Sequence, residues 1–247
     1  MKAPPFPLIT AHAGCMDTPQ NSIESIFAGL KHGADIVEDD IRATKDGALV
    51  LSHDDAIQLS DGRQLRISAL TLQELSTLPQ SPIVELRSAL RIVKETGVLM
   101  NLDVKDDASL EPLADLIAAL GMTDQVFLTG CEHPRAMLAR SRAPLLRKLL
   151  NVQAVSFAAK APEEAVRQAC EEAESAGCFG LNVPYPLVSD NLLKRAEEAG
   201  LPLYVWTVDE PMRMKRCAEW GVQSITTRNV ATLQAVKAHW NQETCRL

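Results

Sequence analysis

Carboxylates and histidines in the N-terminal half of the chain have the types and spacing of a metal-assisted acid–base site. Glu38 and Asp40 are two positions apart in the run IVEDDIRAT, so in a strand both side chains point to the same face. Two such carboxylates repel each other unless a cation lies between them or one is protonated. Asp103 in LMNLDVK adds a third carboxylate. An oxygen-rich set of this kind suits Mg²⁺ or Ca²⁺ better than zinc.

Two histidines accompany these carboxylates. His12 ends the apolar run LITAH, and His53 follows the run ALVLS after a Lys-Asp-Gly turn. Asp-Gly is a strong hairpin signal, and a turn centred between Asp46 and Gly47 would bring His53 level with Asp40. Two imidazoles beside a metal can supply a general base, a general acid and an electrophile.

Short apolar runs alternate with amphipathic stretches along the chain, and these elements must position the site. We expect strands at residues 8–12, 36–44, 99–105, 126–129, 146–152, 180–183, 203–208 and 224–227. We expect helices at residues 21–33, 71–78, 82–97, 110–120, 134–142, 163–176, 190–199, 212–220 and 231–240. Residues 48–53 return as an antiparallel partner of the second strand. Strands that alternate with helices of this size imply parallel pairing through helical crossovers.

Eight parallel strands predict a TIM (β/α)₈ barrel with a β-hairpin extension after the second strand. The 247 residues of the chain match the length of about 250 that is typical of this fold, and we expect a single domain over residues 1–247. The alternative is an open doubly wound sheet, which usually has a Gly-rich loop after its first strand. Here that loop is AGCMDTPQN, with a single Gly, so the barrel is favoured.

The C-terminal ends of barrel strands form one rim, and this rule selects further polar residues. Lys105 ends the third strand, Asn182 the sixth, Trp206 lies on the seventh, and Thr226 and Thr227 lie on the eighth. Taken singly, any of these side chains is more often structural than functional. The histidines and carboxylates at one rim together indicate a site. Trp206 is interpreted as an apolar wall for the substrate rather than as core packing.

The remaining histidines are weaker candidates. His133 follows the fourth strand and is a second-rank rim residue. His32 at the end of a helix and His239 in the last helix are expected on the surface.

Composition limits the class of protein. A formal net charge of -7 and a pI of about 5.3 argue against nucleic-acid binding but allow an anionic small-molecule substrate in a pocket with local cations. The six cysteines are scattered without a CxxC pair and are expected to be reduced. The N-terminal residues lack the apolar region of a signal peptide, and no run is long enough to span a bilayer, so a cytoplasmic protein without a membrane span is expected.

Short motifs follow one another between His12 and Asp55, namely HAG, PQN, GADIVEDD, TKDG and HDD. TLQEL, LDVK, YVWTVD and GVQSITT come later in the chain. Together they resemble the ordered motifs of the glycerophosphodiester phosphodiesterase family, which begin with HRG, PEN, GAD-x-x-E-x-D, T-K-D-G and H-D. The resemblance implies a TIM barrel with one divalent metal, usually Mg²⁺ or Ca²⁺. It also implies a hydrolase of lipid and glycerol metabolism that cleaves glycerophosphodiesters to glycerol 3-phosphate and an alcohol.

The resemblance implies an acid–base pair, three metal ligands and a phosphate contact. The acid–base pair would be His12 and His53. The metal ligands would be Glu38, Asp40 and Asp103, and Lys105 would contact the phosphate. One histidine would activate water or a substrate hydroxyl, and the other would protonate the leaving alcohol, in either order.

The chain departs from the family pattern at four positions. Ala13 stands where the family has Arg, Gln20 replaces the Glu of PEN, Asp103 is shorter than the usual Glu, and Arg228 replaces the usual Asp after the last strand. Loss of the Arg removes a bidentate phosphate contact. Our hypothesis is that Arg228 supplies the missing cation.

These departures motivate a second function, a catalytically degenerate barrel that binds phosphodiesters or acts as a regulatory protein. A third possibility is another barrel chemistry, such as an aldolase or an isomerase. A Schiff-base aldolase would need a buried strand-end lysine without the histidine pair, and Lys105 alone supports it poorly. The sequence indicates neither the alcohol of the substrate nor an oligomeric state.

Overall fold

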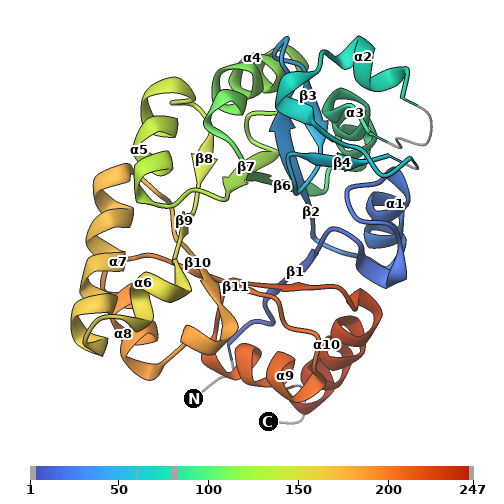
Figure 1. Ribbon diagram of the computed structural model, residues 1–247. Helices are drawn as coiled ribbons and strands as arrows, with labels where there is room; N and C mark the ends of the chain where they lie inside the picture. Colours follow the sequence, from blue (N-terminus) through green and yellow to red (C-terminus); the bar gives the residue numbers. More distant parts are fainter. Residues whose placement is uncertain (1–3, 60, 79–82, 245–247) are drawn as a thin grey trace.

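Parallel strands alternate with helices along the computed structural model, which describes residues 4–59, 61–78 and 83–244. The barrel strands are β1 (Leu8–Ala11), β2 (Ile36–Ala43), β6 (Leu99–Val104), β7 (Val126–Thr129), β8 (Arg147–Lys148), β9 (Leu150–Asn151), β10 (Leu181–Pro184), β11 (Leu203–Trp206) and β12 (Ser224–Thr227). The longer helices are α1 (Ile23–Lys31), α3 (Leu86–Thr96), α4 (Leu110–Leu120), α5 (His133–Arg142), α7 (Pro162–Ala176), α8 (Asp190–Glu198), α9 (Pro211–Trp220) and α10 (Val230–Thr244). These helices surround the strands (Figure 1).

The sheet closes on itself at the segment 147–151. Its strand order is β8-β7-β6-β2-β1-β12-β11-β10-β9, and every pair along this path is parallel. Leu149 N donates to Leu128 O at 2.9 Å, and Leu150 N donates to Gly180 O at 3.0 Å. The segment is therefore bonded to β7 on one side and to β10 on the other. Because β8 and β9 are two parts of this one strand, the described chain has the eight strands of a TIM barrel, and the predicted fold is confirmed.

Local sequence signals account for most of the element boundaries. α4, β7 and β12 begin and end where the apolar periodicity predicts. The short helix α2 (Leu72–Ser76) starts with a capping box, in which Thr71 and Glu74 satisfy each other's backbone N–H groups. The helix predicted for residues 82–97 begins at Leu86, and Pro82 lies outside the described residues. It stops at Gly97, which takes a left-handed φ of 71°.

A short helix and a short hairpin were missed by the sequence patterns. α6 (Ala154–Ala158) follows β9, and the antiparallel hairpin of β4 (Ala56–Gln58) and β5 (Gln64–Arg66) lies in a region predicted as a polar connection. Each is at most five residues long, which is too short for helical or strand periodicity to be distinguished.

The hairpin after β2 forms as predicted, but its register differs by one residue. β3 (Leu49–Leu51) is antiparallel to β2 and places Leu49 opposite Ala43. Ser52 is therefore level with Asp40, and Ser52 N donates to Asp40 O at 3.0 Å. The prediction that His53 would be level with Asp40 is wrong by one position.

The length of the hairpin loop explains this shift. The turn is centred on Asp46, because Thr44 N donates to Ala48 O at 2.8 Å across three intervening residues. Gly47 takes a left-handed φ of 79° and donates to Thr44 O at 3.0 Å. Asp46 Oδ1 accepts from Leu72 N at 3.0 Å, so a contact with α2 favours the longer loop over a two-residue turn.

Alternate residues of each strand point into the barrel, and their character changes along the barrel axis. Ile36, Phe127, Leu149 and Tyr204 form an apolar cluster near the N-terminal ends of the strands. The rings of Phe127 and Tyr204 lie 5.7 Å apart. Glu38 and Asp40 continue the inward face of β2 that begins at Ile36. The apolar cluster therefore packs inside the barrel below the polar residues at the C-terminal ends of the strands.

α1 packs closely against β1 and β2 at Gly29. A Cβ at this position would lie 2.8 Å from Ala11 Cβ and 3.3 Å from Val37 Cγ1. The absence of a side chain thus lets the helix contact the two strands that carry His12 and Glu38.

We expect Gly29→Ala to destabilise the protein by about 1–3 kcal/mol, the usual cost of overpacking a core. Alanine in a helix is otherwise more favourable than glycine by roughly 1 kcal/mol, so the sign of the change is diagnostic. Urea unfolding measures it, and a more stable variant would show that α1 can shift away from the barrel.

Candidate active site

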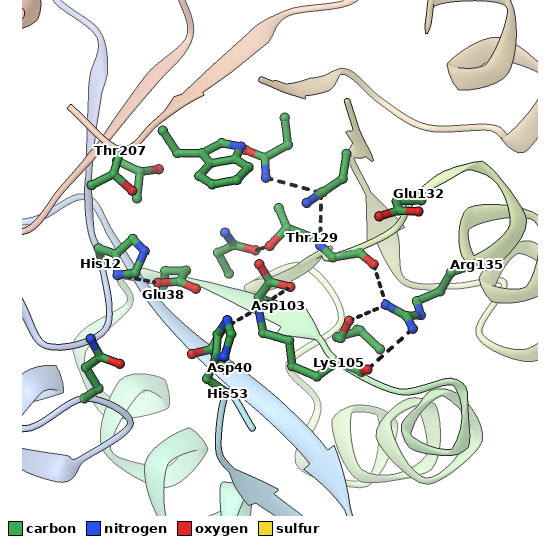
Figure 2. A pocket seen from close by; sticks show the side chains of 18 of the residues that line it. His12, Glu38, Asp40, His53, Asp103, Lys105, Thr129, Glu132, Arg135 and Thr207 are labelled. Atoms are coloured by element: carbon green, nitrogen blue, oxygen red, sulfur yellow. Dashed lines mark hydrogen bonds and ion pairs between the residues drawn. The ribbon is translucent and has the colours of Figure 1, made fainter. Parts of the chain in front are cut away.

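A pocket of 560 Å³ lies at the C-terminal ends of the barrel strands (Figure 2). It is lined by all the residues that were predicted to catalyse, bind metal or contact substrate. These are His12, Glu38, Asp40, His53, Asp103, Lys105, Asn182, Trp206 and Arg228. The structure thus brings together side chains from segments that are far apart in the sequence.

The acidic cluster is built by the alternation of β2 and its register with β6. Asp40 lies opposite Asp103. One carboxylate oxygen from each of Glu38, Asp40 and Asp103 lies within 4.8 Å of the others. Asp39 is buried and does not line the pocket, because the residue between two inward-facing neighbours on a strand points to the other face.

Burial and mutual repulsion dominate the electrostatics of this cluster. Burial raises the pKa of Glu38 well above its ordinary value, and the charges of Asp40 and Asp103 add to the effect. Burial likewise raises the pKa of Asp103, although the charge of Lys105 opposes the shift. Asp103 Oδ1 is buried and receives no hydrogen bond of good geometry from the described residues, although the Lys105 ammonium lies 3.4 Å away. A hard divalent cation would satisfy this oxygen and relieve the repulsion, so the donor set fits Mg²⁺ or Ca²⁺.

Lys105 is the cation that contacts the cluster directly. Its Nζ lies 2.9 Å from Asp40 Oδ1 and 3.4 Å from Asp103 Oδ1. Burial lowers the pKa of Lys105, but the charges of Asp103 and Asp40 outweigh that effect, so its pKa is raised. Lys105 therefore stays protonated and offers positive charge to the pocket.

His12 is oriented by the backbone of the next residue. Its Nδ1 lies 2.9 Å from Ala13 O, and because a carbonyl can only accept, Nδ1 carries the proton. Glu38 Oε2 lies 3.7 Å from the same nitrogen, and Figure 2 shows the two side chains next to each other. Burial lowers the pKa of His12, and the charge of Arg228 contributes in the same direction. The neutral imidazole thus has Nε2 available as a proton acceptor.

His53 is oriented by the side chain of its neighbour. His53 Nδ1 lies 2.9 Å from Asp54 Oδ1, and this hydrogen bond lowers the pKa of Asp54. The side chain of His53 is 59% exposed, because it lies on the loop after β3 rather than inside the barrel. The prediction that the hairpin returns this histidine to the mouth holds, despite the shifted register.

The positions that depart from the family pattern lie in the pocket or next to it. Ala13 is buried, and its N donates to Glu38 Oε2 at 2.9 Å. Gln20 and Arg228 both line the pocket. The backbone of Arg228 is anchored through its N–H, which donates to Asp209 Oδ1 at 2.7 Å.

Several pocket residues were missed by sequence reasoning. They include Asn101, Thr129, Glu132, Arg135, Asn151 and Thr207. Thr129 and Asn151 lie at or near the ends of predicted strands, so the rim rule could have selected them. Arg135 has no such signal, because it lies on α5. Its Nη1 donates to Val104 O and Gly130 O, each at 2.8 Å, and thereby ties together the ends of β6 and β7.

The secondary candidates divide between the pocket and the surface. Thr226 lines the pocket, whereas Thr227 does not. His133 also lies outside it, and His133 Nε2 is 3.0 Å from Ser175 Oγ. His32 is the C-cap of α1, and His239 is exposed on α10.

The fold and the acidic cluster define a class of TIM-barrel enzymes with a carboxylate site at the strand ends, and comparison with known proteins identifies the family. Residues 12–232 match the glycerophosphoryl diester phosphodiesterase family. The chain belongs to this family, which confirms both the resemblance and the prediction of an enzyme of this class.

Relatives and solved structures agree with this assignment. A glycerophosphodiester phosphodiesterase of Caldanaerobacter subterraneus subsp. tengcongensis is 24% identical over 242 residues, which cover 92% of this chain and 96% of the relative. The fold is similar to that of an Oleispira antarctica phosphodiesterase in complex with the product sn-glycerol-3-phosphate. That structure has a TM-score of 0.76 and 19% identity, and the match covers 94% of this chain and 96% of the other. The glycerophosphodiester phosphodiesterase of Thermotoga maritima has a TM-score of 0.75 and 18% identity, covering 93% and 98% of the two chains.

Gly130 leaves the space that the Asp103 carboxylate occupies. It has a φ of 70°, and a Cβ there would overlap Asp103 Oδ1 and Val104 O. We expect Gly130→Ala to displace Asp103 and to weaken divalent metal binding by about 10–100-fold, as is typical when support for a ligand is lost. Isothermal titration with Mg²⁺ and Ca²⁺ measures the change.

Gly177→Ala is the matched control for this substitution. Gly177 has a φ of 66°, but nothing lies within 4 Å of its added Cβ, so it carries similar backbone strain without the collision. Equal metal affinity in the two variants would exclude a role for Gly130 in placing Asp103.

Proposed function

We propose that this protein is a metal-dependent phosphodiester hydrolase that cleaves glycerophosphodiesters to glycerol 3-phosphate and an alcohol. The observation that carries the proposal is the joint placement of the acidic cluster and two histidines in one pocket. The family assignment supports the same substrate class. The product complex of the Oleispira antarctica relative adds to that support.

Glu38, Asp40 and Asp103 would hold one divalent metal, Mg²⁺ or Ca²⁺. Such an ion polarises a phosphoryl oxygen and stabilises the negative charge that develops during hydrolysis. Lys105 supplies a further positive charge beside Asp40 and Asp103. We assign Lys105 to the phosphate, because an ammonium group in a partly enclosed pocket attracts a phosphodiester.

His12 is assigned as the general base and His53 as the general acid. His12 Nε2 accepts a proton from water or from a neighbouring substrate hydroxyl, since Nδ1 is bonded to Ala13 O. His53 donates a proton from Nε2 to the leaving oxygen, because Nδ1 is bonded to Asp54. A positioned acid or base contributes typically 10²–10⁴-fold to rate.

The remaining predicted contacts are assigned to the substrate. Asn182 and Trp206 line the pocket from β10 and β11, where an amide and an indole face can hold the alcohol portions. Arg228 is assigned to the phosphate in place of the arginine that Ala13 replaces. All of these groups suit a small molecule in a pocket of 560 Å³.

The first test is a panel of glycerophosphodiesters assayed with Mg²⁺, Ca²⁺ and Mn²⁺. We expect turnover that chelation abolishes and that metal restores, because the acidic cluster cannot polarise the phosphate alone. His12→Ala and His53→Ala are each expected to lower kcat by about 10²–10⁴-fold. Activity that survives chelation would contradict the metal assignment.

Arg228 offers a separate test of the phosphate side. We expect Arg228→Ala to raise KM roughly 10–100-fold, the usual effect of losing a charged hydrogen bond, and Arg228→Lys to recover part of it. Arg195→Ala on α8 is the control, since Arg195 pairs with Glu198 on the surface. An unchanged KM in Arg228→Ala would refute the compensation for Ala13.

A second candidate function is a catalytically degenerate barrel that binds phosphodiesters or regulates a partner. Ala13 and Gln20 favour it, because both replace charged residues of the family pattern. The substrate panel discriminates between the two functions. No turnover above the His12→Ala control would support the binding protein.

The proposal extends to the domain organisation, the cellular compartment and the class of ligand. We propose that residues 1–247 form one domain and that the protein is cytoplasmic. Among the described residues, no helix combines the length and apolar character that a membrane span requires. The net charge of -7 favours a small-molecule substrate over nucleic acid.

A further inference from the structure

Arg42 lies at the edge of the site but does not line the pocket. It is on β2, two residues beyond Asp40, in the part of the strand that pairs with the hairpin return. Its side chain is 18% exposed, so it is largely enclosed. Any effect of Arg42 on the reaction must therefore pass through another residue.

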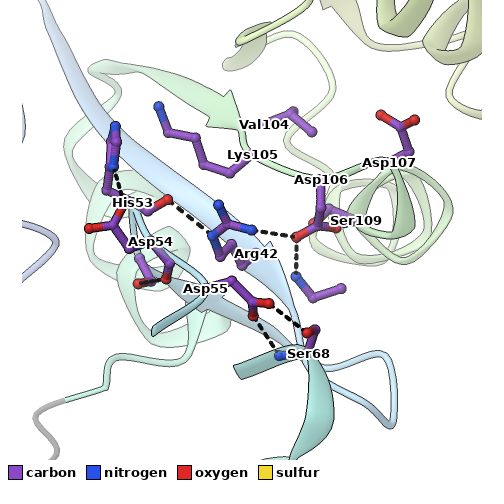
Figure 3. Close-up of polar contacts among 12 residues, drawn as sticks. Arg42, His53, Asp54, Asp55, Ser68, Val104, Lys105, Asp106, Asp107 and Ser109 are labelled. Carbon is purple, nitrogen blue, oxygen red and sulfur yellow. Dashed lines mark hydrogen bonds and ion pairs between the residues drawn. The ribbon is translucent and has the colours of Figure 1, made fainter. Parts of the chain in front are cut away.

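The guanidinium of Arg42 joins two segments that are distant in sequence. Arg42 Nε donates to His53 O at 3.0 Å, and Arg42 Nη1 lies 3.8 Å from Asp106 Oδ2. Figure 3 shows Arg42 between these two partners. The side chain thus links the loop that carries His53 to the segment after β6.

The carboxylate of Asp106 is held in place by further hydrogen bonds. Its Oδ2 also accepts from Ala43 N at 3.1 Å, and its Oδ1 accepts from Ser109 N and Ser109 Oγ, each at 2.9 Å. Asp106 directly follows Lys105 and lies three residues after Asp103. Its position is therefore tied to the strand that carries the proposed metal ligand and the phosphate contact.

His53 needs such support because it lies beyond the last β3 residue. Its imidazole is bonded only to the adjacent Asp54 among the contacts described, and Asp54 is itself exposed. Asp55 fixes the far side of this loop, since its carboxylate accepts from Ser68 N at 2.8 Å and from Ser68 Oγ at 2.7 Å (Figure 3). Arg42 supplies a second restraint on this loop through its hydrogen bond to the His53 carbonyl.

We propose that Arg42 is a positioning residue that fixes the backbone of His53 against Asp106 and so sets the distance of this histidine from the metal and phosphate groups. The inference rests on the proposed acid–base role of His53. A guanidinium is required because its Nε contacts His53 O while its Nη1 contacts the Asp106 carboxylate. An ammonium group cannot make both contacts with the same geometry.

The kinetic signature differs from that of a binding residue. We expect Arg42→Gln to lower kcat by about 10–100-fold, in line with the loss that follows a misplacement of about 1 Å. KM and the metal concentration for half-maximal activity should change less than about twofold. Arg42→Lys keeps a charge near Asp106 and should restore only part of kcat.

A double-mutant cycle separates positioning from a structural role. In the His53→Ala background, the further loss caused by Arg42→Gln should disappear, because no imidazole remains to be positioned. Arg167→Gln on α7 is the matched control, since Arg167 forms an exposed pair with Glu171 at 2.8 Å. It should leave kcat unchanged in either background.

NMR of the histidine side chains provides a readout that does not depend on turnover. In Arg42→Gln, the His53 imidazole resonances should shift or broaden, whereas those of the distant His239 should stay in place. An equal loss of kcat in the wild-type and His53→Ala backgrounds would overturn the inference, and so would unperturbed His53 resonances. In either case an active wild type would still support the proposed function. A wild type without turnover would refute both the proposed function and the catalytic part of the inference. The His53 resonances would still show whether Arg42 fixes the position of His53.

Discussion

The crowding of three carboxylates in one partly enclosed pocket is the constraint on which the rest of the site depends. Glu38, Asp40 and Asp103 lie within reach of a single cation, and burial raises the pKa of both Glu38 and Asp103. Charges held this close in a poorly solvated space are stable only with compensation. Lys105 and the Ala13 N–H provide part of it, and a divalent cation would provide the rest.

Closure of the barrel makes this crowding possible. The parallel register of β2 and β6 sets Asp40 beside Asp103, and the apolar cluster below them keeps the inward faces of the strands in place. Gly130 at the end of β7 leaves room for the Asp103 carboxylate. The acidic cluster is thus built on rigid strands, which would suit metal ligands whose positions must be held closely.

The two histidines are supported in different ways. His12 follows a barrel strand and is oriented by the Ala13 carbonyl. His53 lies on a loop, where Asp54 contacts its imidazole and Arg42 donates to its backbone carbonyl. In the proposed assignment, Ala13 and Arg228 depart from the family pattern on the phosphate side, whereas Glu38 and Asp40 keep that pattern on the metal side.

Local patterns in the sequence were enough to predict the barrel, most of its elements and many, but not all, of the residues that line the pocket at its rim. A strand places every second side chain on one face, so alternation alone assigns Glu38 and Asp40 to the pocket and Asp39 to the opposite side. Helix caps follow from equally local signals, as Thr71 and Gly97 show. The same reasoning selected His53 through the hairpin.

Only the tertiary structure decided how distant segments contact one another. The hairpin is centred on Asp46 because its carboxylate also accepts from Leu72 N, 26 residues away, and this moved Ser52 rather than His53 level with Asp40. The contacts of Arg42 with Asp106 and of Arg135 with the ends of β6 and β7 likewise join separate elements. Periodicity determines the direction of a side chain within its own element. Which partner that side chain meets depends on how the closed barrel brings the other elements to it.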